Sequence, residues 1–135
     1  MKGVVLVDLP VKNDPRGSLT IAEKFKEIPF DIRRVFWISN VPANEERAAH
    51  AHKELQQFIV AVAGCFRVIV DNGTDKESFI LDRANKGLLV EPGIWITLSD
   101  FSNNSVCLVM APEEYREEEY LKDYSEFLTW KNSKS

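Results

Sequence analysis

The chain has 135 residues, the length of one domain, which is enough to bury a core without disulfides or a structural metal. Hydrophobic residues make up 44% and charged residues 28%, values that are typical of a soluble globular protein and exclude a disordered chain. The 17 Lys and Arg against 21 Asp and Glu give a net charge of −4, which argues against general binding to nucleic acid. No apolar run approaches the ~20 residues that a membrane-spanning helix needs.

The first ten residues are expected to belong to the fold and not to a secretory signal. They hold about five apolar residues before Asp8 and no small-residue cleavage site. We therefore expect a cytoplasmic protein in which Cys65 and Cys107 are buried free thiols and form no disulfide.

Short runs of β-branched and aromatic residues, separated by turn residues, follow one another from about residue 3 to about residue 111. The segments expected as strands are 3–9, 18–23, 34–39, 55–63, 65–70, 78–81, 87–90, 94–98 and 105–110. Asp71-Asn72-Gly73 supplies the strongest hairpin signal, because these residues tolerate positive φ. The spacing of about 8–12 residues is typical of a sandwich or small barrel, and no linker or repeat divides the chain. We predict a single all-β domain over residues 1–135.

The tail, about residues 112–130, predicts one or two short helices packed on the outside of the β structure. Pro112 suits the first turn of a helix, and the glutamates after it favour the positive N-terminal end. Apolar residues then recur at three- and four-residue spacing, namely Tyr120, Leu121, Tyr124, Phe127 and Leu128. The acidic run is interpreted as a solvated helical face, with an interaction tail as the alternative.

Both histidines of the chain lie in one tetrapeptide, His50-Ala51-His52-Lys53. On an extended strand, residues i and i+2 point to the same face, so the two imidazoles are expected side by side. Imidazole titrates near neutral pH, so a pair in a cavity is suited to acid–base chemistry on two atoms of one substrate. A solvated or structural pair is the alternative.

The spacing around this pair is His-x-His-x4-Gln-x6-Gly, from His50 to Gly64. It resembles the first motif of the cupin superfamily, in which Glu usually stands at the position of Gln57. Residues 87–95 match the turn of the second cupin motif, but no histidine follows them. A metal site needs three or four suitable donors, and two histidines with a neutral amide are a poor set. We expect no metal and no other cofactor.

Four phrases spread along the chain are more specific: residues 14–19 (DPRGSL), 28–35 (IPFDIRRV), 47–53 (RAAHAHK) and 95–102 (WITLSDFS). With the tyrosine-bearing acidic tail, they resemble the sugar-nucleotide 3,4-ketoisomerases. The resemblance implies a cupin jelly-roll barrel and a homodimer that exchanges its N-terminal strands. It also implies an isomerase that moves the ketone of dTDP-4-keto-6-deoxyglucose from carbon 4 to carbon 3, for the synthesis of 3-amino-3,6-dideoxy sugars of surface glycans.

On the pattern of this family, His50 and His52 match the paired histidines of the active site. The resemblance implies that one takes the proton from carbon 3 to form an enediol and that the other moves protons between the two oxygens. The sequence leaves open which histidine does which. Phe36 and Trp37 stand where members of the family often carry tyrosine, so the two histidines are the only titrating catalysts that the sequence indicates.

Arginines are expected to bind the diphosphate of such a substrate, because a guanidinium offers a planar fork of donors. The candidates are Arg16, Arg34, Arg47 and Arg67, each with a surface or ion-pairing role as the alternative. Gln57 is expected to hydrogen-bond the sugar or to satisfy polar groups of the core. Trp95, Phe36 and Trp37 are candidates for stacking on thymine, with a place in the core as the alternative for each.

Three other functions stay open. An epimerase of the same sugar nucleotides would also form an enolate in a cupin barrel, but it would normally pair His with Asp and place a Tyr opposite. A non-catalytic sugar-nucleotide-binding cupin would use the arginines alone. A metal-dependent oxygenase would need a metal on the histidines.

Overall fold

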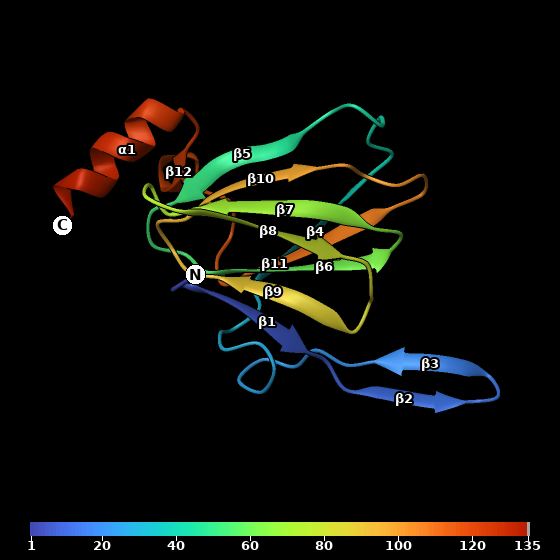
Figure 1. Ribbon diagram of the computed structural model, residues 1–135. Helices are drawn as coiled ribbons and strands as arrows, with labels where there is room; N and C mark the ends of the chain where they lie inside the picture. The colour runs from blue at the N-terminus through green and yellow to red at the C-terminus, as the bar shows by residue number, and fades with distance from the viewer. Residues whose placement is uncertain (135) are drawn as a thin grey trace.

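The computed structural model describes residues 1–134, which form two facing β-sheets with an attached hairpin and a C-terminal helix (Figure 1). The strands are β1 (Val4–Asp8), β2 (Val11–Asp14), β3 (Gly17–Thr20), β4 (Arg34–Ser39), β5 (Arg47–His52), β6 (Gln57–Ala63), β7 (Phe66–Asp71), β8 (Lys76–Leu81), β9 (Lys86–Val90), β10 (Trp95–Ser99), β11 (Val106–Ala111) and β12 (Tyr120–Leu121). The helical elements are the 3-10 turn η1 (Glu117–Glu119) and the α-helix α1 (Tyr124–Ser133).

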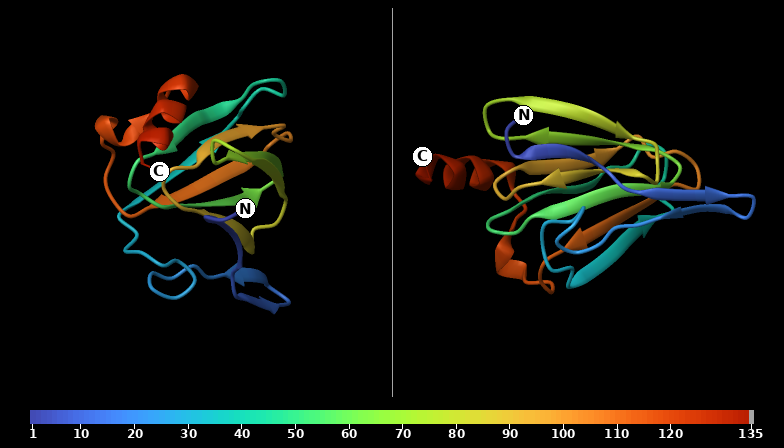
Figure 2. Two further views of the ribbon diagram at one scale, coloured as in Figure 1. Left: turned by 60° about the vertical axis from the view of Figure 1, so that its left-hand side comes forward. Right: turned by 90° about the horizontal axis from the view of Figure 1, so that it is seen from below.

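The sheets have the strand orders β1-β9-β6-β11-β4 and β12-β5-β10-β7-β8, and neighbouring strands are antiparallel. Most neighbours in a sheet are distant in sequence, so the chain crosses repeatedly from one sheet to the other, as the two views of Figure 2 show. This is a jelly roll, in which two sheets pack face to face. The prediction of an all-β jelly-roll barrel with a short C-terminal helix is confirmed.

The main core lies between the two sheets and follows from alternation along their strands. On β7, Phe66, Val68 and Val70 are buried in this core, while Arg67 between them is not. The same alternation on β10 buries Ile96 and Leu98. One face of each strand therefore points into the barrel, and this face supplies the walls of any internal cavity.

Strand β6 is buried on both of its faces, which explains its nearly continuous apolar sequence. Ile59 belongs to the core between the sheets, whereas Phe58 and Val60 belong to a second cluster. That cluster is completed by Ile28 and Phe30 from the segment between β3 and β4. This segment therefore covers the outer face of the sheet.

The hairpin of β2 and β3 projects beyond the two sheets (Figure 1). Most of its residues are exposed, including Leu19, whose exposed fraction is 58%. Exposed apolar side chains continue on β1 at Val5 and Leu6. An apolar strip of this kind is typical of a surface that a partner covers.

The tail differs from its predicted helical form. Residues 117–119 make only a 3-10 turn, and Tyr120 and Leu121 form β12, which pairs with β5 in the register Tyr120↔His52 and Leu121↔Ala51. The α-helix begins later, at Tyr124, where the side chain of Asp123 accepts a hydrogen bond from the backbone N–H of Glu126 (3.2 Å). A pairing with a distant strand has thus overridden the local helical spacing.

Both cysteines are free, as predicted. Cys107 is buried, and burial raises the pKa of its thiol to about 12, whereas Cys65 is half-buried. Within residues 1–134, no helix is long and apolar enough to cross a membrane.

Candidate active site

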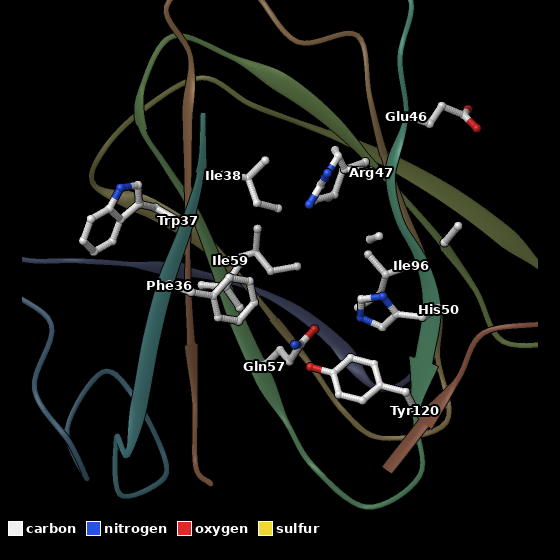
Figure 3. Close-up of a pocket in the computed structure, with 14 residues that line it drawn as sticks. Phe36, Trp37, Ile38, Glu46, Arg47, His50, Gln57, Ile59, Ile96 and Tyr120 are labelled. Atoms are coloured by element: carbon white, nitrogen blue, oxygen red, sulfur yellow. The ribbon is translucent and has the colours of Figure 1, made fainter. Parts of the chain in front are cut away.

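A cavity of about 450 Å³ opens between the two sheets, with walls from both. Figure 3 shows His50 and Tyr120 on one side of it and the β4 residues Phe36 and Ile38 on the other. Apolar side chains from β6, β10 and β11 line much of the remainder, namely Ile59, Ile96, Leu98 and Val109. The cavity therefore presents a few polar groups on an apolar wall, as small-molecule sites commonly do.

A β-bulge in β5 positions the first histidine. Along the pairing with β10, His50 lies opposite Ile96 but Ala48 lies opposite Thr97, so Ala49 is an extra residue. Ala48 and Ala49 both have positive φ, +69° and +54°, which L-residues rarely adopt. Because Arg47 lies opposite Leu98, the bulge brings Arg47 and His50, three residues apart, to the same face of the sheet.

Beyond the bulge, β5 is regular, and the predicted pairing of the histidines holds. The ring centroids of His50 and His52 lie 5.1 Å apart, with the planes close to perpendicular. His50 lines the cavity, whereas His52 lies behind it with an exposed fraction of 3%. Among the described residues, Nε2 of both rings and Nδ1 of His52 are buried and have no hydrogen-bond partner.

Burial keeps both imidazoles neutral near neutral pH. It is the largest cause that lowers the pKa of His52 to about 3, followed by the neighbouring His50 and then by Arg34. Burial also lowers the pKa of His50, with Lys122 and Arg34 adding to the effect and a backbone hydrogen bond with Ala48 opposing it. A neutral imidazole carries one unprotonated nitrogen, so each ring is able to accept a proton.

Tyr120 completes the polar side of the cavity, and the sequence did not indicate it. Because β12 pairs with β5, its ring lies 4.9 Å from that of His50 and 4.5 Å from that of His52. Its hydroxyl oxygen accepts a hydrogen bond from Nη2 of Arg34 (3.1 Å). A phenol is therefore present at the site, although Phe36 and Trp37 occupy the positions where it was sought.

Glu119 is a second residue beside the histidines that the sequence did not indicate. It was assigned to a solvated helical face, but its exposed fraction is only 4%. One carboxylate oxygen, Oε2, accepts hydrogen bonds from the backbone N–H groups of Glu54 (2.9 Å) and Leu55 (2.8 Å). The same oxygen lies 3.7 Å from Nδ1 of His52, so the carboxylate anchors the loop after β5 directly behind the histidine pair.

The predicted binding residues divide into two groups by position. Arg47 and Gln57 line the cavity, and Arg34 reaches it through its hydrogen bond with Tyr120. The guanidinium of Arg34 also lies over the rings of Phe36 (5.3 Å) and Tyr115 (5.7 Å). Gln57 is almost fully buried, and in the view of Figure 3 it lies between Phe36 and Tyr120.

Arg16, Arg67 and Trp95 do not line this cavity. Arg67 is on the outer face of β7, where Nε donates to Asp100 (2.9 Å) and Nη1 donates to Ser78 (3.1 Å). Arg16 lies on the projecting hairpin and pairs with Asp14.

Trp95 packs instead against the C-terminal helix, with its ring centroid 5.3 Å from that of Tyr124 and 5.7 Å from that of Phe127. Trp37 belongs to the cavity lining, but it is 64% exposed, and its indole lies on the other side of β4 from Phe36 and Ile38 (Figure 3). A role for any of these residues in substrate binding stays a prediction.

A metal ion at the site would need three or four donor side chains close together. No group of three or more His, Cys, Asp or Glu side chains gathers to hold a metal ion within residues 1–134. The prediction that the reaction uses no metal rests on the donor set of His50, His52 and Gln57 and stays a prediction.

A jelly-roll barrel with paired histidines inside it defines a protein of the cupin class, to which the motif spacing also pointed. Within that class, the chain belongs to the FdtA family, described as WxcM-like, C-terminal, whose sequence model matches residues 2–132. The resemblance noted from the four phrases is thereby confirmed.

Three similar proteins carry the same activity in their names. The chain is 41% identical, over 84% of its length and 82% of the relative's, to TDP-4-oxo-6-deoxy-alpha-D-glucose-3,4-oxoisomerase of Aneurinibacillus thermoaerophilus. It is 39% identical to a 3,4-ketoisomerase of Helicobacter canadensis, with a TM-score of 0.93 over 96% of this chain and 97% of the other. It is 29% identical to the sugar 3,4-ketoisomerase QdtA of Thermoanaerobacterium thermosaccharolyticum, solved in complex with TDP, with a TM-score of 0.96 over 99% and 98% of the two chains.

Proposed function

We propose that this protein is a sugar-nucleotide 3,4-ketoisomerase that converts dTDP-4-keto-6-deoxyglucose into the 3-keto-6-deoxyhexose. The observation that carries the proposal is a pair of neutral histidines, of which His50 is half-buried and His52 is buried. Their Nε2 atoms have no partner among the described residues, and they lie at the wall of a cavity between the sheets. The names of relatives that match nearly the whole chain support the same reaction. The product would then supply the ketone for a 3-amino-3,6-dideoxy sugar.

The chemistry needs only proton transfers. A proton leaves carbon 3 while the oxygen on carbon 4 gains one, which gives an enediol. The hydroxyl on carbon 3 then loses its proton, and a proton returns to carbon 4. Carbon 3 is oxidised and carbon 4 is reduced within one molecule, so no external oxidant or reductant takes part.

Position favours His50 as the group that takes the carbon proton. His50 lines the cavity, whereas His52 lies behind it. A general base must come within hydrogen-bond reach of the proton that it removes, directly or through one water. If His50 is the carbon base, the family resemblance leaves the oxygen protons to the other histidine, His52.

Arg47 and Gln57 are the proposed substrate-binding residues of this chain's own cavity. Arg47 is exposed at the wall shared with His50, which suits contact with a diphosphate that extends towards solvent. Gln57 is buried in the facing sheet, on β6, and offers both an amide donor and a carbonyl acceptor to a sugar hydroxyl.

We also propose a homodimer with exchanged N-terminal strands, as the resemblance implied. Support comes from the exposed apolar strip of β1 and from the projecting β2–β3 hairpin, which carries Arg16. Strand exchange would carry the hairpin to the other subunit, so Arg16 would serve a site that is not its own. A cytoplasmic location stays a prediction from the sequence.

Proton NMR of dTDP-4-keto-6-deoxyglucose incubated with the protein in deuterated water tests the function. We expect deuterium to enter the ring as a 3-keto species appears. Replacing His50 by Asn should abolish this turnover while TDP affinity, measured by calorimetry, is largely kept. If wild type binds TDP without exchange, the isomerase proposal fails and a non-catalytic binding module replaces it. Exchange that yields only an epimer would identify an epimerase.

A further inference from the structure

Tyr120 is a polar side chain of the site to which the sequence hypothesis gives no role. It lines the cavity from β12, and its ring contacts both histidines. Its position is fixed by the backbone pairing with His52 and by Glu119, the preceding residue, whose carboxylate is anchored on the loop after β5. The position of Tyr120 beside the histidines is therefore fixed by the strand pairing and by the anchored residue that precedes it.

The hydrogen bond with Arg34 sets the direction of the phenol. Arg34 is a donor only, so the Tyr120 oxygen accepts at 3.1 Å, and its own hydrogen is left to point elsewhere. In Figure 3 the hydroxyl points into the cavity, towards the side on which Gln57 lies. The guanidinium would also stabilise negative charge that develops on the phenol oxygen when its proton is passed on.

His52 is less accessible to substrate oxygens than Tyr120. The imidazole of His52 is shielded, with an exposed fraction of 3%, and it is absent from the cavity wall that His50 and Tyr120 share. A group that exchanges protons with two neighbouring oxygens must touch both of them. Among the titrating side chains at this wall, Tyr120 lies beside the proposed carbon base.

We propose that Tyr120 is the catalytic acid on the oxygen side of the reaction, an inference that rests on the proposed isomerase function. As His50 takes the proton from carbon 3, the phenol gives its proton to the oxygen on carbon 4, and the enediol forms. The phenolate then takes the proton of the hydroxyl on carbon 3 as that carbon becomes the ketone, while His50 returns its proton to carbon 4. Both groups end in their starting protonation states.

The Tyr120→Phe variant tests this role, because it removes only the hydroxyl and keeps the ring contacts with both histidines. Tyr115→Phe is the matched control. The ring centroid of Tyr115 lies 5.2 Å from that of Tyr120, and the Arg34 guanidinium lies over the Tyr115 ring. However, Tyr115 is 54% exposed, and its hydroxyl donates a hydrogen bond to Glu117 outside the cavity. We expect Y120F to lower kcat by about 100-fold or more, with TDP affinity within about twofold of wild type, and Y115F to change neither.

The split between kcat and KM supplies a readout that a structural role would not give. Y120F should lower kcat and leave KM near the wild-type value, because the phenol acts in the proton transfers and not in binding the substrate. A kcat for Y120F within about threefold of wild type would overturn the inference while leaving the isomerase function intact. Inactive wild type would overturn the function itself. If Y120F proves unfolded by circular dichroism, Arg34→Gln, which removes the orienting guanidinium, must lower kcat by at least about tenfold, or the inference fails.

Discussion

At the scale of single residues, the histidine pair is kept ready for catalysis by its exclusion from water. Desolvation disfavours the charged imidazolium, so both rings stay unprotonated at pH values where exposed histidines begin to titrate. The neutral rings have nitrogen lone pairs available for a substrate, but the fold becomes sensitive to acid as a consequence. At low pH, the folded state must either keep a charged imidazolium buried or open to expose it to water.

This sensitivity predicts a pH-dependent stability. The pKa of His52 falls from 6.5 to about 3 on folding, so the unfolded chain binds more protons between these values and the free energy of unfolding decreases as pH falls below about 6.5. Above that pH the contribution of the neutral ring is fully present. We expect ~1 kcal/mol to be lost per pH unit from His52 in this window. Urea unfolding of wild type and of His52→Gln at about pH 7.5 and about pH 5 checks it, because the variant should lose less stability on acidification. Equal losses in both proteins would contradict the assignment.

Glu119 predicts a stability effect that its exposed neighbour does not share. Glu119→Ala would leave the N–H groups of Glu54 and Leu55 without an acceptor, at a cost of roughly 2–4 kcal/mol in the free energy of unfolding. Glu119→Gln keeps a carbonyl oxygen and should cost less. Glu118, whose side chain is 73% exposed, is the control, and Glu118→Ala should change stability by less than about 0.5 kcal/mol. Equal urea midpoints for E119A and E118A would show that the anchor contributes nothing.

At the scale of secondary-structure elements, what the sequence could predict depended on whether the signal was local. Alternation identified most strands of the barrel and correctly placed His50 and His52 on one face. The same alternation in residues 65–70 puts Arg67 opposite in direction to Phe66 and Val68, so its outward position could have been recognised. Trp95 is separated in the same way from Ile96.

Other features depend on pairings between distant strands and have no local signature. Tyr120 and Glu119 lie in an acidic segment with helical spacing, and only the pairing of β12 with β5 turns them towards the histidines. The bulge at Ala49 is equally hidden, because alanine carries no preference for positive φ. Yet the bulge decides that Arg47 shares a face with His50.

The bulge itself predicts an effect of side-chain shape at an exposed position. Ala49 has φ of +54°, a conformation that a β-branched residue adopts only at high cost. We expect Ala49→Val to destabilise the protein by about 1–3 kcal/mol and to lower kcat, since Arg47 and His50 are both re-aimed. Ala49→Gly tolerates the same φ and should stay close to wild type in melting temperature and kcat. An A49V variant as stable and active as A49G would mean that the bulge does not hold the site.

At the scale of the whole molecule, one chain forms both sheets of the barrel, but its β2–β3 hairpin has few packing contacts that would stabilise it. The hairpin's strands are exposed along their length, and a two-stranded hairpin is marginally stable alone. Arg16 lies at this hairpin, outside the cavity of its own chain, although its phrase DPRGSL was part of the family resemblance. An exchanged dimer accounts for both facts, because it would cover the hairpin and give Arg16 a cavity to serve.

Subunit complementation decides this arrangement. In the exchanged dimer, a site takes Arg16 from one subunit and His50 from the other, so Arg16→Ala and His50→Asn should each lower kcat strongly when alone. Unfolded together and refolded at equal concentrations, the two variants form mixed dimers in which one site holds both native residues. Random pairing should then restore about a quarter of wild-type activity, because about half of the dimers are mixed and each has one working site. Light scattering shows whether the refolded species is dimeric, and recovery through an affinity tag on one of the two variants measures the yield of mixed dimers. If Arg16 instead acts on the cavity of its own chain, every site of a mixed dimer lacks either Arg16 or His50. Activity then stays at the level of the separate variants.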